Sequence, residues 1–133
     1  VDTHGSLTAI MLGPTRGRHE FAYSADLPTR ISIPFVMIIG CALTAGPNSI
    51  GTTLFLRGAE SVWGPCIKFQ SLSIGNSDEQ QTIWYRAFFD SLLQGQDVGT
   101  SVLMARQAVP DGGLFKYAYL TVGSSLLRFA QPA

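Results

Sequence analysis

The sequence predicts an α/β domain with a largely parallel sheet. Residues 31–39, ISIPFVMII, form a continuous apolar run with β-branched and aromatic members, which is typical of a strand buried on both faces. Helical signals follow this run, and more follow the next strand-like segment, residues 60–69. The order strand, helix, strand, helix, helix, strand is the order expected of a sheet covered by helices.

The first half of the chain is expected to contain one long connection and one helix. Residues 13–30 are rich in glycine, proline and charge, and predict a long loop or ribbon. Pro34 suits the early part of the following strand, where a lost backbone donor costs least. A helix from about Pro47 or Asn48 to Arg57 fits, with Pro47 in its first turn and Gly58 just past its end.

Two helices and a strand are expected in the second half. Ser77 has the signature of an N-cap, and Gly95 marks the stop of a helix that runs to Leu93. Apolar residues near one face of this helix are Ile83, Trp84, Ala87, Phe88 and Leu92. Asp97 can cap a second helix over about residues 98–109, and the alternating residues 115–123 predict a final strand.

Composition limits the possible classes of function. The 133 residues predict a single domain, and 46% hydrophobic against 14% charged residues predicts a packed core. Nine acidic and nine basic residues cancel, so we expect no nucleic-acid partner and no membrane surface as partner. The longest apolar stretch, residues 31–45, is too short and too interrupted to span a bilayer.

The cysteine and histidine content bears on compartment and metals. Two cysteines and no N-x-[ST] site favour a reducing, cytoplasmic setting over a disulfide-bonded secreted one. Two cysteines and two histidines at unrelated spacings do not supply a zinc site, so neither a metal nor another cofactor is expected. The chain begins with Val1 rather than Met, which favours a processed product or a piece of a longer polypeptide.

Two strand ends carry side chains that could react. His4 follows a short opening segment and Cys41 follows the apolar run, and the carboxyl ends of neighbouring strands meet at one sheet edge. An imidazole can take the proton of a thiol and later protonate a leaving amine. The backbone N–H groups of Gly5 and Cys41 could then face a developing oxyanion, and Gly40 would allow the chain to turn sharply. Taken singly, however, a cysteine after a strand is more often a buried small hydrophobe, and a lone histidine is more often solvated.

The ordered set of segments resembles the CHAT branch of the caspase-like cysteine peptidases, which is related to separases and gingipains. The resemblance begins with THG (residues 3–5), GCALTAG (40–46) and LRGAESVWG (56–64). It continues in the same order with AFFDSLLQGQDVGTSVLMARQAV (87–109) and the aromatic FKYAYLTVGSS (115–125). It covers nearly the whole chain, and the motifs are individually short.

This resemblance implies a caspase-like three-layer α/β/α sandwich with a mostly parallel sheet. It implies that His4 is the base, Cys41 the nucleophile, and Gly5 an oxyanion donor in a cysteine endopeptidase that forms a thioester acyl-enzyme on a protein or peptide substrate. The region from Trp63 to Lys68, with Gly64, would line part of the peptide groove.

The chain departs from the family pattern in two ways. The strands that precede the histidine strand in the family are missing, so residues 1–133 would form the C-terminal part of the domain. A fused regulatory segment or a partner chain would then supply the rest. The residues after the cysteine, ALTAG, lack the polar groups often found in relatives. A basic residue before the cut, recognised by Asp2, is one hypothesis for specificity.

A catalytically inert caspase-like scaffold for protein contacts is the alternative to the peptidase. A hydrolase of another type is a weaker idea, because the sequence has no G-x-S-x-G nucleophile elbow.

Overall fold

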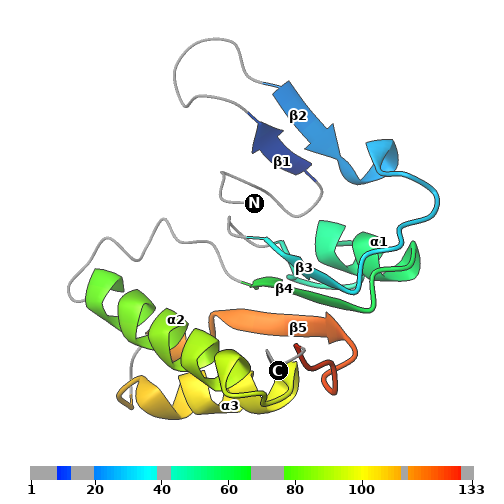
Figure 1. Ribbon diagram of the computed structural model, residues 1–133. Coiled ribbons are helices and arrows are strands. Elements are labelled where there is room, and N and C mark those ends of the chain that lie inside the picture. The colour runs from blue at the N-terminus through cyan, green and yellow to red at the C-terminus, as the bar shows by residue number, and fades with distance from the viewer. Residues whose placement is uncertain (1–8, 13–19, 39–42, 67–76, 112–113, 130–133) are drawn as a thin grey trace.

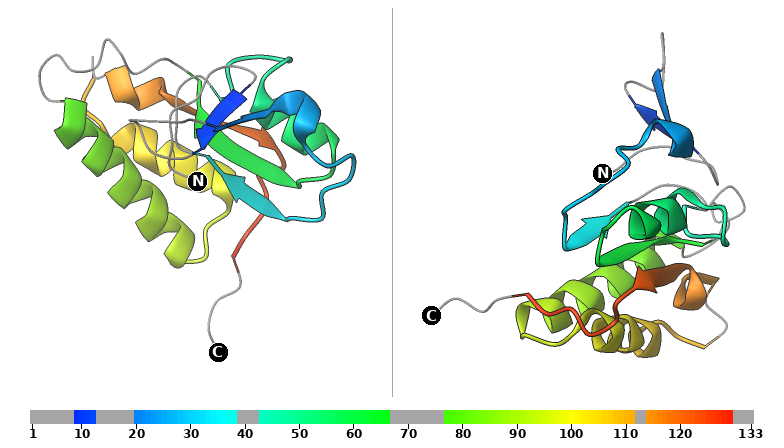
Figure 2. Two further views of the ribbon diagram at one scale, coloured as in Figure 1. Left: turned by 90° about the horizontal axis from the view of Figure 1, so that it is seen from above. Right: turned by 90° about the vertical axis from the view of Figure 1, so that its right-hand side faces the viewer.

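The computed structural model of the chain describes residues 9–12, 20–38, 43–66, 77–111 and 114–129. A three-stranded sheet in the order β3–β4–β5 is formed by Phe35–Met37, Ser61–Pro65 and Tyr119–Gly123. Helix α1 (Ile50–Leu56) covers one face of this sheet, and α2 (Ser77–Leu93) and α3 (Val98–Ala108) cover the other (Figures 1 and 2). A separate hairpin pairs β1 (Ala9–Leu12) with β2 (Glu20–Tyr23). The mixed α/β class predicted from the sequence is therefore confirmed.

The sheet separates two hydrophobic clusters, because successive side chains of β4 point to opposite faces. Val62 packs toward α1, with Ile38, Leu43, Ile50, Leu54 and Ala59. Trp63 packs toward α2 and α3, with Trp84, Phe88, Leu92, Val98, Val102, Ala105, Val109, Ala118 and Tyr119. All five residues of β4 are buried. The central strand thus contributes to both cores.

Strand direction follows from the connections. β3 and β4 are parallel, with Val36 opposite Val62, and α1 connects them. β4 and β5 are antiparallel, with Trp63 opposite Thr121. Helices α2 and α3 lie between β4 and β5, and α3 runs back along α2 (Figure 1), so the chain re-enters the sheet in the opposite direction. The predicted parallel direction is found for β3 and β4, and β5 adds an antiparallel strand.

The first helix begins later than its sequence predicts. The helix starts at Ile50, not at Pro47 or Asn48. Ser49 precedes it as the N-cap, and its hydroxyl accepts a hydrogen bond from the backbone N–H of Thr52 at 3.2 Å. The Thr52 hydroxyl donates to the carbonyl of Gly46, which fixes the turn before the helix. A side chain that satisfies an otherwise free N–H determines the helix start more strongly than the fixed φ of proline. Gly58 lies just past the helix end, as predicted, with φ +119°.

Replacement of Ser49 by alanine should destabilise the protein by about 1 kcal/mol, the typical cost of a lost N-cap. The N–H of Thr52 would lose its acceptor in a part of the chain where Ser49 itself is fully buried. Urea unfolding monitored by far-UV circular dichroism measures this cost. The neighbouring exposed residue provides the control, because Asn48→Ala should leave the midpoint unchanged. Equal midpoints for Ser49→Ala and the parent protein would contradict the assignment of the cap.

The predicted strand over residues 31–39 is wrong in its first part. Residues 31–34 are not in a strand, and the described strand covers only Phe35–Met37, whose side chains are half-buried. Hydrogen bonds hold the preceding chain to the end of α1: the Ile31 N–H donates to the Arg57 carbonyl, and the Arg57 guanidinium donates to the carbonyls of Leu27 and Pro28. Pro34 has no N–H for the ladder. The strand therefore starts after the proline.

The predicted end of α2 and the predicted bounds of α3 agree with the structure, whereas Ser77, predicted as the N-cap, is the first residue of α2. α2 spans Ser77–Leu93, and it ends in a Schellman motif in which Gly95, at φ +85°, donates to Leu92 and Gln96 donates to Ser91. The Asp97 carboxylate accepts from the Thr100 N–H at 2.7 Å and so caps α3. That hydrogen bond lowers the pKa of Asp97. Short connections of this kind place the two helices side by side.

The final strand is shorter than predicted. Residues 115–118 do not extend it, because Leu114–Tyr117 forms a 3₁₀ turn and β5 begins at Tyr119. The Lys116 ammonium donates to the Val109 carbonyl at 2.9 Å and pairs with Asp111 at 3.2 Å. These contacts hold the chain against the end of α3, and the strand therefore starts only at Tyr119.

Candidate functional site

The residues predicted to carry the chemistry, His4 and Cys41, lie outside the described residues. The same holds for Gly5, Gly40 and Asp2. Trp63 and Gly64 are described, and both are buried in β4. The described surroundings of the candidate site are the residues on either side of the Cys41 segment and those at the carboxyl end of β4.

The residues on either side of the segment that contains Cys41 are hydrogen-bonded to β4. On one side, the Ile38 N–H donates to the Trp63 carbonyl at 3.0 Å. On the other, the Thr44 N–H donates to the Pro65 carbonyl at 3.0 Å, and the Thr44 hydroxyl donates to the Gly64 carbonyl at 3.0 Å. Both flanking residues are thus bonded to the last three residues of β4. In α/β sheets, this end of parallel strands is where ligands and reactive groups gather.

Because Gly64 has no side chain, Thr44 and Ile38 can lie close to the backbone of β4 at its carboxyl end. A Cβ placed on it would lie 3.1 Å from the Thr44 side chain and 3.2 Å from the Ile38 carbonyl oxygen. Both distances are tighter than ordinary carbon contacts. The described surroundings of Gly64 are therefore packing contacts with the two flanks of the Cys41 segment. Its predicted role in substrate binding stays a prediction.

The side chain of Trp63 lies in an aromatic cluster and is fully buried. It stacks on Tyr119 at 4.7 Å and on Phe88 at 5.1 Å between ring centroids, and it contacts Trp84 at 5.4 Å. The indole N–H groups of Trp63 and Trp84 are buried and have no hydrogen-bond partner. The indole of Trp63 is thus a core element, and the structure gives it no exposed surface with which to line a groove.

A hydroxyl cluster next to Trp63 was not foreseen from the sequence. The hydroxyls of Tyr85 and Tyr119 lie 2.5 Å apart, and the Gln81 amide donates to Tyr85 at 2.9 Å. Burial, and then the neighbouring Tyr85, raise the pKa of Tyr119 far above its ordinary value. The i, i+4 spacing of Gln81 and Tyr85 on α2 was the only available signal. Tyr119 therefore stays protonated at neutral pH, and its hydroxyl acts as a neutral hydrogen-bonding group.

Cys66 lies directly after β4 and its thiol is a donor to backbone carbonyls. Its sulfur lies 3.3 Å from the carbonyl oxygens of Tyr117 and Ala118. Burial raises the pKa of the Cys66 thiol, against the opposing effects of a backbone hydrogen bond and of Arg106. At neutral pH this thiol is protonated and weakly nucleophilic. These contacts make Cys66 a packing residue at the end of β4.

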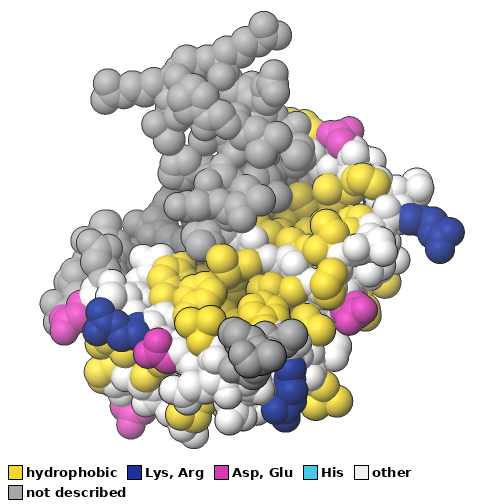
Figure 3. Space-filling model, viewed as in Figure 1, with side chains coloured by type: hydrophobic (Ala, Val, Ile, Leu, Met, Phe, Trp, Pro, Cys, Tyr) yellow, Lys and Arg dark blue, Asp and Glu magenta, His cyan; other side chains and the backbone are white. Residues whose placement is uncertain are grey.

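Apolar side chains gather on the face seen in Figure 3, in the region where Figure 1 places β3 and α2. Half-buried side chains of these two elements that pack on the larger core are Phe35, Met37, Ile83, Tyr85, Ala87 and Phe89.

Within the described part of the chain, no group of three or more His, Cys, Asp or Glu residues could hold a metal ion. None of the described helices is long and apolar enough to cross a membrane.

Comparison with known protein families and with curated protein sequences gave no match to this chain. The assignment of function therefore depends on the residues themselves.

Proposed function

We propose that the chain is a cysteine endopeptidase that cleaves peptide bonds in protein substrates through Cys41 and His4. One observation carries most of the weight: Ile38 and Thr44, which flank the Cys41 segment, are both bonded to the carboxyl end of the parallel strand β4. The order of His4-Gly5 and Gly40-Cys41 along the chain supports the same assignment. A fold-level resemblance alone would not, because one fold hosts many functions.

In the proposed reaction, the Cys41 sulfur attacks the carbonyl carbon of the scissile peptide bond while His4 accepts the thiol proton. The backbone N–H groups of Gly5 and Cys41 stabilise the oxyanion. His4 then gives its proton to the leaving amine, the C–N bond breaks, and a thioester remains on Cys41. Water, deprotonated by His4, hydrolyses the thioester and regenerates the thiol.

The second candidate is an inert scaffold of the same architecture. The burial of Trp63, which was expected at the peptide groove, favours it, because the described part of that groove is occupied by core packing. The two candidates differ in the reactivity of Cys41. In either case, a fused segment or a partner chain is proposed to complete the sheet and regulate the protein.

Reaction with a peptidyl acyloxymethyl ketone distinguishes the two candidates. We expect a single addition at Cys41 at pH 7, at least about 100-fold faster than addition at Cys66, because only an activated thiol is substantially ionised there. Peptide mapping by mass spectrometry measures both sites. Cys66 is the internal control, since burial raises its pKa and its reactivity should appear only at alkaline pH.

Two variants complete this test. Cys66→Ala should be labelled like the parent protein, and His4→Ala should be labelled slowly. Labelling of Cys41 no faster than labelling of Cys66 would exclude the peptidase and leave the scaffold.

A further inference from the structure

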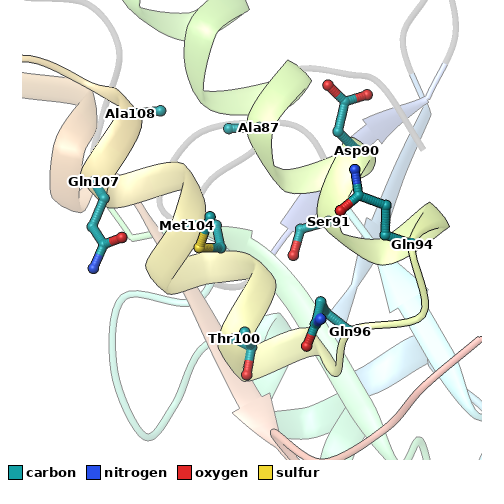
Figure 4. A pocket seen from close by; sticks show the side chains of 9 residues that line it. All are labelled: Ala87, Asp90, Ser91, Gln94, Gln96, Thr100, Met104, Gln107 and Ala108. Carbon is teal, nitrogen blue, oxygen red and sulfur yellow. The ribbon is translucent and has the colours of Figure 1, made fainter.

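A groove runs between α2 and α3 on the side turned away from the sheet (Figure 4). Its volume is about 530 Å³, and it is lined by Ala87, Asp90, Ser91, Gln94, Gln96, Thr100, Met104, Gln107 and Ala108. Ser91 and Met104 point into the space between the two helices (Figure 4). This groove is separate from the carboxyl end of β4 and takes no part in the proposed reaction.

Small residues create the groove. Ala87 and Ala108 lack long side chains, and the hydroxyl of Ser101 donates to that of Ser91 at 3.1 Å between the helices. The helix backbones can therefore approach closely and leave a hollow above the contact. A second hollow of about 240 Å³ continues from it along α2, shares Ala87, Asp90 and Ala108 with the first, and adds Arg86.

The two hollows contain one basic and one acidic side chain. Arg86 and Asp90 lie one turn apart on α2, both exposed, and they are the only ionisable residues among those that line the hollows. Within the part of the chain that the structure describes, neither forms an ion pair. Large apolar side chains on the same two helices are also exposed: Leu93 by 72%, Leu103 by 55% and Met104 by 48%.

We propose that this face is the interface of a homodimer, in which a second copy of the chain packs α2 antiparallel to the first across a twofold axis. A twofold interface must be self-complementary, since each residue meets the partner copy of another residue of the same patch. Opposite charges one turn apart on one helix meet this condition. Arg86 of each copy then faces Asp90 of the other, so the interface contains two equivalent ion pairs. The same contact would cover exposed apolar side chains of α2 and α3.

A different partner explains the pattern less well. A cationic peptide would satisfy Asp90 and be repelled by Arg86, and an anionic one would do the reverse. Only a surface with both charges in reversed order matches both residues, and a second copy of α2 presents that surface.

Charge reversal tests the proposal in the full chain. Sedimentation velocity over a concentration series up to about 1 mM should show a concentration-dependent dimer. Arg86→Asp and Asp90→Arg should each weaken dimerisation by at least about 10-fold, because each creates two like-charge contacts. The double variant should regain the affinity of the parent protein. An equimolar mixture of the two single variants should form a heterodimer, since one carries two acidic and the other two basic groups at these positions.

Glu60→Arg is the matched control, because Glu60 is exposed on the loop before β4 and lines neither hollow. It should leave dimerisation unchanged. Circular dichroism verifies that every variant is folded. A parent protein that stays monomeric over the whole series would overturn the proposal. So would a dimer that both single reversals leave intact, because the contact would then lie on another face.

Discussion

Replacement of Cys41 by alanine should reduce cleavage of a denatured protein substrate by at least about 10³-fold while the fold is kept. The expected loss is large because the thiol forms the covalent intermediate, and no other described group could replace it. Cys66 is not a substitute, since its thiol donates to two carbonyls and its pKa is raised by burial. Product formation measured by gel electrophoresis and mass spectrometry, with circular dichroism for the fold, gives the result.

The dyad also predicts how the variants combine. His4→Ala should lose activity to a similar extent, and the double variant Cys41→Ala/His4→Ala should be no worse than either single variant, because residues that act as a unit are not additive. Cys66→Ala should cleave at the rate of the parent protein. If instead Cys66→Ala loses activity and Cys41→Ala keeps it, the wrong thiol has been assigned.

Replacement of Trp63 by alanine should destabilise the protein by about 3–5 kcal/mol, the range for a buried large aromatic residue. Trp63 is fully buried in the central strand, and its ring contacts Trp84, Tyr85, Phe88 and Tyr119 within 5.9 Å between centroids. Its indole N–H has no partner, so the loss comes from packing and not from a hydrogen bond. Urea unfolding at constant m-value measures the change.

Two controls separate packing from a role in substrate binding. Trp63→Phe keeps much of the ring contact and should cost clearly less than the alanine variant. Leu126→Ala should have little effect, because Leu126 is 77% exposed. An alanine variant as stable as the parent protein would contradict the placement of Trp63 in the core. A changed cleavage preference in the folded Trp63→Phe variant would indicate that its region does contact the substrate.

The parts of the fold that the sequence predicts well are those with local signals. The Gly95 stop of α2 and the Asp97 cap of α3 each depend on contacts within a few residues, and each agrees with the structure. The start that the sequence predicts for α1 is too early, because two local signals compete there. The Ser49 cap determines the start, and Pro47 lies in the preceding turn.

Longer-range contacts explain the remaining differences. The strand at residues 31–39 is shortened by contacts of Arg57, which is distant in sequence, and β5 is shortened by Lys116 bound to the end of α3. The pattern of apolar and polar residues along the sequence does not predict these contacts. Similarly, the resemblance between short motifs places Trp63 at the peptide groove. Its burial depends instead on the rings of Phe88 in α2 and Tyr119 in β5. The chemistry at His4 and Cys41 stays a prediction from the sequence.

The most direct test of the proposed peptidase is a comparison of cleavage sites. The protein and its Cys41→Ala variant would each be incubated with a protein mixture, and newly formed N-termini would be identified by mass spectrometry. We predict new N-termini preceded by a common residue type with the parent protein, and none above background with the variant. The same set of N-termini from both proteins, or none from either while Cys41 resists the peptide electrophile, would contradict the proposal.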